Sequence, residues 1–265
     1  MHSPDKLSIL FLGDVIGKPG RQVVVDYLNN LEKKPDLIIA NVENAAHGFG
    51  LTKDIYTELK TAGIQVFTGG NHTFDRKEIF EFIDESPEII RPANFPAQTP
   101  GKGYCLIETT KTKVGVLNIQ GQVFMDNLDS PFAVADKILP ELQSQTNVIF
   151  VDFHAEATAE KVGMGWYLDG KVSALVGTHT HVQTADERIL PGGTAFITDA
   201  GPCGPRDGII GMDKDSVFRR MINHLPSRFE VASGPAKLHG VMIEVDPSSG
   251  KANKIERVQY EMATP

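Results

Sequence analysis

The stretch ALVGTHTHVQT, residues 174–184, joins a short apolar run to two histidines that stand two positions apart. The run has the composition of a buried strand, and in extended backbone residues two apart point to the same side. His179 and His181 are therefore expected to project side by side at the end of that strand. Two protonated imidazoles would repel each other there, whereas one or two metal ions would hold both rings neutral.

Four other apolar runs have the same continuous, β-branched-rich character, at residues 7–12, 36–42, 64–69 and 147–153. Continuous rather than alternating hydrophobicity is typical of parallel strands that are covered on both faces. Segments with helical spacing separate most of these runs, at residues 21–33, 52–63, 76–85 and 130–143. In these segments Thr52 is a predicted N-cap, Gly63 a predicted terminator and Pro140 a predicted interruption. The pattern predicts βαβ units.

Two predicted hairpins add antiparallel strands at the edges of the sheet. Residues 103–121 indicate strands on either side of a TKTK turn, and residues 236–260 indicate strands around DPSSGK. The remaining stretch 86–103 is rich in proline and glycine and is expected to be a surface loop or a cap over a site. Residues 1–265 are expected to form a single domain.

The composition excludes several classes of protein. Of 265 residues, 41% are hydrophobic and 23% charged, with a formal net charge of −8, which argues against an extended nucleic-acid surface. Only two cysteines are present, so neither a disulfide framework nor a thiolate zinc site is indicated. No apolar stretch approaches the ~18 residues that a membrane span needs. Without a recognisable signal peptide, a cytoplasmic protein is expected.

Polar donors follow each of the five predicted strands, at the end where ligands bind in α/β sheets. Each has an ordinary alternative, since Asp14 or Asn71 alone could cap a helix and His154 alone could be a core histidine. Five such coincidences favour a metal site instead. The seven candidate ligands carry oxygen or nitrogen and no sulfur: Asp14, Glu43, Asn44, Asn71, His154, His179 and His181.

This donor set suits manganese, iron or zinc better than calcium or copper(I). Seven ligands exceed what one tetrahedral ion takes. They fit two ions that share a bridging carboxylate, roughly 3.5–4 Å apart, an arrangement that hydrolyses phosphate esters.

The motifs GDVIG, GGNHTFD, FHAE and GTHTH are similar to those of the calcineurin-like metallophosphoesterase superfamily. Together with NVENAAHGFGLT, RPANFP and DFHAEATAEK, they closely resemble the YmdB-type bacterial phosphodiesterases, over about residues 7–260. The resemblance implies an α/β sandwich of mixed sheets flanked by helices, with the metals at the C-terminal ends of the strands. It also implies two bound metal ions, of iron or manganese, with zinc as an alternative.

The resemblance further implies a role for each donor. The first metal would be held by Asp14, Asn44 and His181, the second by Asn71, His154 and His179, with Glu43 bridging them. His72 would be the catalytic histidine beside the metals, and Asp75 would either orient its ring or cap the next helix. Where the superfamily pattern has a histidine ligand, this chain has Ile16, and Asn44 is expected to replace that ligand.

The implied activity is hydrolysis of cyclic nucleotides, 2′,3′-cyclic in preference to 3′,5′-cyclic, by a hydroxide that the two metals activate. His72 would protonate the leaving oxygen or stabilise its charge. Two alternatives stay open: a phosphomonoesterase or protein phosphatase, and a nucleotide-binding regulatory protein with incidental hydrolysis. A homo-oligomer is also left open. Four aromatic residues could stack on a base or belong to the core: Phe49, Phe74, Phe95 and Trp166.

Overall fold

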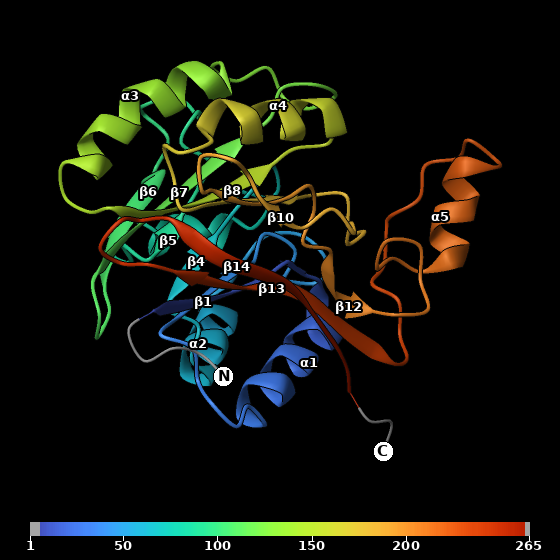
Figure 1. Ribbon diagram of the computed structural model, residues 1–265. Coiled ribbons are helices and arrows are strands. Elements are labelled where there is room, and N and C mark those ends of the chain that lie inside the picture. The colour runs from blue at the N-terminus through green and yellow to red at the C-terminus, as the bar shows by residue number, and fades with distance from the viewer. Residues whose placement is uncertain (1–5, 263–265) are drawn as a thin grey trace.

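The computed structural model describes residues 6–262, so both ends of the predicted 1–265 domain lie outside it. Two β-sheets lie face to face at the centre, with α1 and α2 on the outer side of one and α3 and α4 on the outer side of the other (Figure 1). The expected sandwich of mixed sheets flanked by helices is confirmed. Among the described residues, no helix is both long and apolar enough to cross a bilayer.

The first sheet has the order β2–β12–β13–β1–β3–β4–β5, and β14 pairs with the other side of β13. Strands β1, β3, β4 and β5 are parallel, whereas β13 is antiparallel to both β1 and β14. The predicted C-terminal hairpin therefore lies at the edge of this sheet. Its strands are β1 (Leu7–Leu12), β2 (Asp14–Val15), β3 (Leu37–Asn41), β4 (Val66–Thr68), β5 (Ile89–Ile90), β12 (Pro202–Pro205), β13 (Ala236–Val245) and β14 (Ala252–Glu261).

The second sheet has the order β10–β11–β9–β8–β7–β6. Strands β7, β8, β9 and β11 are parallel, and the edge strands β6 and β10 are antiparallel to their neighbours. The predicted hairpin over 103–121 is confirmed as β6 and β7. The strands are β6 (Tyr104–Glu108), β7 (Lys113–Gln120), β8 (Val148–His154), β9 (Ala174–Thr178), β10 (Arg188–Ile189) and β11 (Ala195–Ile197).

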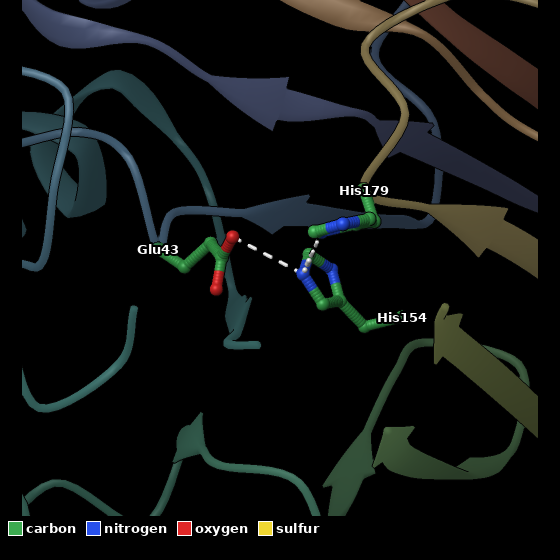
Figure 2. A group of neighbouring side chains, drawn as sticks. All are labelled: Glu43, His154 and His179. Carbon is green, nitrogen blue, oxygen red and sulfur yellow. Dashed lines mark hydrogen bonds and ion pairs between the residues drawn. The ribbon is translucent and has the colours of Figure 1, made fainter. Parts of the chain in front are cut away.

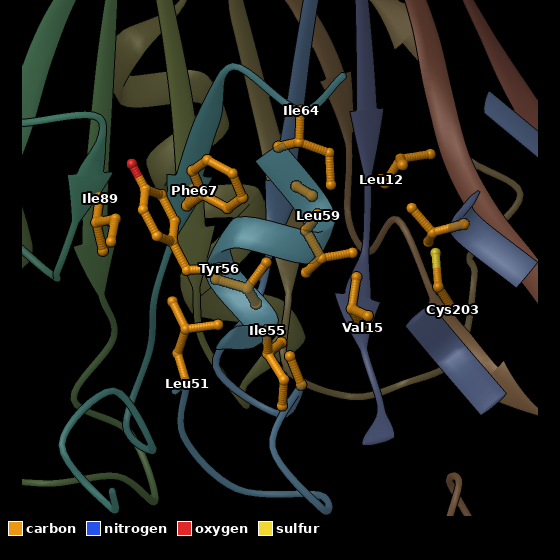
Figure 3. Close-up of a cluster of buried hydrophobic side chains, with 14 of the residues drawn as sticks. Leu12, Val15, Leu51, Ile55, Tyr56, Leu59, Ile64, Phe67, Ile89 and Cys203 are labelled. Carbon is orange, nitrogen blue, oxygen red and sulfur yellow. The ribbon is translucent and has the colours of Figure 1, made fainter. Parts of the chain in front are cut away.

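The central strands are apolar throughout because each of their faces is covered. In β1, Ile9 and Phe11 pack between the two sheets, while Leu10 and Leu12 pack beneath helices α1 and α2. Across the interface between the sheets, Phe11 and Phe150 meet with ring centroids 5.1 Å apart. The cluster beneath α2 is shown in Figure 3. Because both faces of these strands are buried, the position of each strand is fixed. The positions of the donors that follow the strands are therefore fixed as well.

The helices are α1 (Gly17–Asn29), α2 (Lys53–Ala62), α3 (Pro131–Gln143), α4 (Thr158–Leu168) and α5 (Lys214–Met221), with a 3-10 helix η1 (Lys77–Glu81). Helix α2 ends as predicted at Gly63, whose φ of 116° is left-handed. Thr52 occupies the N-cap position, but its side chain makes no capping hydrogen bond.

Three helix predictions were wrong in detail. Helix α1 begins at Gly17 rather than 21, because Pro19 lies in the first turn, where no backbone N–H donor is needed. The segment 76–85 contains only the short η1, since one 3-10 turn suffices to bury Ile79. Pro140 lies inside α3 and does not interrupt it, because Leu139 and Leu142 hold the helix against the second sheet.

The segment 86–103, expected to be a surface loop or a cap, contains β5 and lies beside the second sheet. Its Ala93 N–H donates to the carbonyl of Asn118, 2.8 Å away, and the Asn94 side chain donates to the carbonyl of Gln120. None of its residues lines the cavity at the predicted metal site.

Candidate metal centre

Three of the predicted donors, Glu43, His154 and His179, converge where strands of the two sheets end. Their ligand atoms all lie within 4.8 Å of one another (Figure 2). Nε2 of His154 is 3.1 Å from Glu43 Oε1 and 3.1 Å from His179 Nδ1. It is also 3.0 Å from Asn71 Oδ1. Donors at the ends of four separate strands thus surround one buried point.

The orientation of His154 is fixed from behind by a buried hydrogen-bond chain. Its Nδ1 lies 2.9 Å from Thr178 Oγ1, and that hydroxyl donates to Asp152 Oδ1 at 2.7 Å. Since the hydroxyl proton is used toward Asp152, Nδ1–H donates to the hydroxyl oxygen and Nε2 faces the cluster. Asp152 is fully buried, and this burial raises its pKa to about 6. The sequence reasoning missed Asp152, which no strand-end position marks.

The cluster favours a positive charge at His154 and a neutral ring at His179. Burial would lower the pKa of His154, but the carboxylates of Glu43 and Asp14 raise it to about 9. Burial and then the charge of His154 lower the pKa of His179 to about 3. His179 Nε2 lies 3.1 Å from Glu156 Oε2, so its Nδ1 is turned toward His154. A metal ion would supply the positive charge that this point selects.

The loop that carries His179 and His181 has strained backbone. Their φ angles are 98° and 59°, in the left-handed region that residues other than glycine seldom occupy. Between them, the backbone N–H and hydroxyl of Thr180 both donate to Asp199 Oδ2, at 3.1 and 2.8 Å. That oxygen also accepts from Nζ of the fully buried Lys161 at 2.7 Å. This buried ion pair, also missed from sequence, fixes the positions of both histidines.

Asp14, Asn44 and His181 form the second part of the site. Asp14 accepts from the backbone N–H of His179, and its Oδ1 lies 3.9 Å from His181 Nε2. The pKa of Asp14 is raised by burial. Among the described residues, Asp14 Oδ1 and Asn44 Oδ1 are buried without a hydrogen-bond partner. Asn44 is held by its amide nitrogen, which donates to the Gly48 carbonyl at 2.9 Å.

Glu43 lies between the two parts. Its Oε2 accepts from the backbone N–H of His72 at 2.7 Å, and its Oε1 faces His154. Burial would raise its pKa, but the charge of His154 lowers it to about 2, so Glu43 is a carboxylate. A Cβ atom at Gly70 would lie 2.3 Å from Glu43 Oε2 and 2.4 Å from His154 Nε2. The glycine before Asn71 therefore keeps the centre of the cluster open.

These observations fit a metal centre. Orphaned buried oxygens are uncommon and call for a partner, and a cation is one that carboxylate and amide oxygens prefer. All seven predicted donors lie at this end of the sheets.

His72 lies beside the cluster, and its ring contacts both Asp75 and Phe49. Its Nδ1 is 2.8 Å from Asp75 Oδ2, so Asp75 orients the ring, as one of the two interpretations predicted. The Phe49 ring meets it edge-on at 4.8 Å between centroids. His72 thus has one nitrogen committed to Asp75 and the other available.

A cavity of about 340 Å³ opens on the donors, a size within the usual range of small-ligand sites. One wall carries Glu43, Asn44, His179 and His181, with His72 beside them. A second part of the lining, the apolar wall, is formed by Ile209, Ile210, Met212, Val217, Met221 and Phe229. No sequence motif marked this wall.

Other predicted or conspicuous features lie elsewhere. Of the four aromatic residues considered for base stacking, only Phe49 lines the cavity. Phe74 and Phe95 pack on each other, and Trp166 lies beneath the guanidinium of Arg188. A larger cavity of about 990 Å³ is lined by β6, by residues that flank β5 and by the C-terminal ends of α2 and α3, and none of the predicted donors lines it.

Comparison with known proteins identifies similar chains. A family model described as YmdB-like protein matches residues 10–258. The chain is 53% identical over 254 residues to the 2′,3′-cyclic-nucleotide 2′-phosphodiesterase of Bacillus subtilis (strain 168), covering 95% of this chain and 96% of that one. The crystal structure of a novel phosphatase from Mycoplasma pneumoniae has a TM-score of 0.91 at 36% identity, covering 97% of this chain and 94% of that one. A 5′-nucleotidase precursor from Thermus thermophilus shares the fold alone, with a TM-score of 0.57 at 14% identity over 97% of this chain and 54% of that one.

Proposed function

The chain belongs to the YmdB-like protein family, and we propose that it is a metal-dependent phosphodiesterase that hydrolyses 2′,3′-cyclic nucleotides. The proposal includes 3′,5′-cyclic nucleotides as poorer substrates, because their six-membered ring lacks the strain of the five-membered cyclic diester. The observation that carries it is the buried donor cluster, in which Asp14 Oδ1 and Asn44 Oδ1 have no hydrogen-bond partner among the described residues.

In this proposal two metal ions, of iron or manganese, are bound by the seven donors. Asp14, Asn44 and His181 would hold the first ion, Asn71, His154 and His179 would hold the second, and Glu43 would be shared between them. When bound, such a pair supplies Lewis acidity that makes water a nucleophile near neutral pH and neutralises charge on the phosphate oxygens. The ionised state of Glu43 and the neutral state of His179 suit both for this role.

His72 is proposed to act on the leaving group. Because Nδ1–H donates to Asp75, the free Nε2 can carry a second proton and deliver it to the departing ribose oxygen. Phe49 contacts the ring and limits its movement. Buried Asp152, through Thr178, and the Lys161–Asp199 pair hold the ligand side chains in place.

A direct test compares substrates on one preparation of enzyme. The purified protein is assayed with 2′,3′-cyclic AMP, 3′,5′-cyclic AMP and the monoester 3′-AMP, with added manganese and with a chelator. We expect 2′,3′-cyclic AMP to be opened to a monophosphate fastest, and the chelator to abolish the reaction. Turnover that persists in the chelator, on protein shown to be metal-free, would overturn the proposal.

A phosphomonoesterase is the second candidate. It is favoured by the high structural similarity to a protein described as a novel phosphatase. Faster hydrolysis of 3′-AMP or of a phosphopeptide than of any cyclic nucleotide would establish it in place of the first.

A further inference from the structure

The cavity is lined by two sets of residues with opposite chemistry, one polar and one apolar. One half presents ionisable and amide donors from the ends of the strands. The other half comes from a single segment, residues 209–229, which includes α5 and lies away from the two sheets (Figure 1). A ligand that fills both halves must therefore join a phosphate group to an apolar group within about 340 Å³.

The apolar half offers no hydrogen bond to a ligand from its lining side chains or from the carbonyls of its turn. Its lining side chains on this segment are aliphatic, thioether or phenyl: Ile209, Ile210, Met212, Val217, Met221 and Phe229. The four backbone carbonyls of the turn Ile209–Met212 each accept a hydrogen bond from within the protein. Thioether and phenyl groups are favourable partners for the face of an aromatic ring.

One part of the apolar half, the turn Ile209–Met212, is held close to the donors. His181 Nδ1 lies 2.9 Å from the carbonyl of Ile210, which links one donor directly to the apolar wall. Ile210 has a φ of 48°, which is unusual for a β-branched residue and indicates a turn that the surroundings hold in place. Beneath the wall, the fully buried Ile16 packs with Met212 and Val217.

Ile16, which packs under this wall, also occupies the position of a metal ligand that this chain lacks. It stands at the position where the superfamily pattern has a histidine. In this chain the side chain is turned into the apolar cluster under the wall, and a Cβ at Gly211 would approach its Cδ1 to 2.6 Å. The same position thus supports the apolar half of the cavity instead of coordinating an ion.

We propose that this apolar wall is the nucleobase subsite, and that it accepts all four bases with little discrimination. The inference rests on the proposed function and adds to it the origin of substrate preference. With the cyclic phosphate at the donors, the ribose spans the middle of the cavity and the base lies against Met212, Met221 and Phe229. A wall without free hydrogen-bonding side chains binds the face of a base and does not select its polar edge.

The experiment compares substrates that differ only in the base. Wild-type enzyme is assayed with 2′,3′-cyclic AMP, GMP, CMP and UMP, and with methyl β-ribofuranoside 2′,3′-cyclic phosphate, which has no base. We expect kcat/KM for the four nucleotides to agree within about tenfold. Removing the base should lower kcat/KM about 10- to 100-fold, chiefly through KM, because the buried apolar contact is lost.

Met221 and Ile222 give a matched pair of variants. Both are exposed apolar residues at the end of α5, at 65% and 68% of their accessible surface, but only Met221 lines the cavity. Met221→Ala should raise KM for 2′,3′-cyclic AMP about three- to tenfold. It should also reduce the ratio of kcat/KM for 2′,3′-cyclic AMP to kcat/KM for the base-free analogue. Ile222→Ala should leave both substrates unaffected. Phe229→Leu provides a second variant on the same wall, with the same direction of change.

The outcomes separate this inference from the proposed function. If the base-free analogue matches the nucleotides in kcat/KM, or if one base is preferred more than about a hundredfold, the subsite assignment is wrong while the phosphodiesterase stands. If none of the five diesters is hydrolysed, the proposed function itself fails.

Discussion

The two walls of the cavity are built in opposite ways. The donor wall consists of strand ends. Asp14, Glu43, Asn44 and His154 are buried there, and the wall is supported by further buried groups such as Asp152 and Asp199. The apolar wall consists of one helix and its flanking loops, and several of its neighbours on that segment are exposed, including Phe218 and Leu225. The residues proposed to bind metal therefore lie on the more rigid part of the fold. The residues proposed to contact the substrate's base lie on a segment with fewer buried contacts.

The largest effect is expected from a substitution at the centre of the donor wall. Glu43→Gln keeps the shape of the side chain but removes the charge between the proposed metal ions. We expect kcat for 2′,3′-cyclic AMP to fall at least about a thousandfold, since metal-ion catalysis contributes several kcal/mol. The measurement is steady-state kinetics, with Glu81→Gln on η1 as an exposed control. Activity within tenfold of wild type would contradict the bridging role.

A second change tests the histidine beside the cluster. His72→Ala should lower kcat by about 10²- to 10³-fold, within the range for general acid catalysis, while leaving the metal content unchanged. Asp75→Asn should have a smaller effect, because it only weakens the orientation of the ring. An equal loss of bound metal in His72→Ala would show that His72 acts as a ligand instead.

A third change tests whether buried support is what makes the donor wall rigid. Asp152→Asn removes the charge that accepts the hydroxyl proton of Thr178 behind His154. We expect metal affinity or kcat to fall about 10- to 100-fold. Titration of the metal-free protein with manganese measures the affinity directly. Unchanged affinity would mean that packing alone orients the histidine.

The smallest effect concerns the other wall. Backbone amides of α5 should exchange with solvent faster than those of β8, because α5 packs on the body through few buried residues, chiefly Val217. Hydrogen exchange followed by mass spectrometry measures this difference. A bound nucleotide analogue should slow exchange in α5 and leave β8 unchanged. Equal protection of the two elements without ligand would remove the distinction between the walls.

The donor wall could be predicted from the sequence because its signals are local. Continuous apolar runs fixed the strands, and a polar residue after each run gave the donors, from Asp14 to His181. The convergence of these donors follows from parallel strands ending at one edge. Helix limits were less predictable, as Gly17 and Pro140 show, because packing on the sheets overrode local helix-breaking signals.

The apolar wall could not be predicted because its contacts are long-range. Nothing near Ile16 in the sequence indicates that it packs beneath Met212 and Val217, which lie about two hundred positions later. The buried Lys161–Asp199 ion pair could not be predicted for the same reason. The two residues are far apart in the sequence, and only the fold brings Lys161 Nζ within 2.7 Å of Asp199 Oδ2.

In the proposed function, the strand-end donors hold a pair of metal ions. The most direct measurement is elemental analysis of protein purified without added metal, for the wild type and for His154→Ala. We predict close to two ions of iron or manganese per wild-type chain and a clear loss in the variant. Wild-type protein that hydrolyses 2′,3′-cyclic AMP while containing no metal would contradict the account.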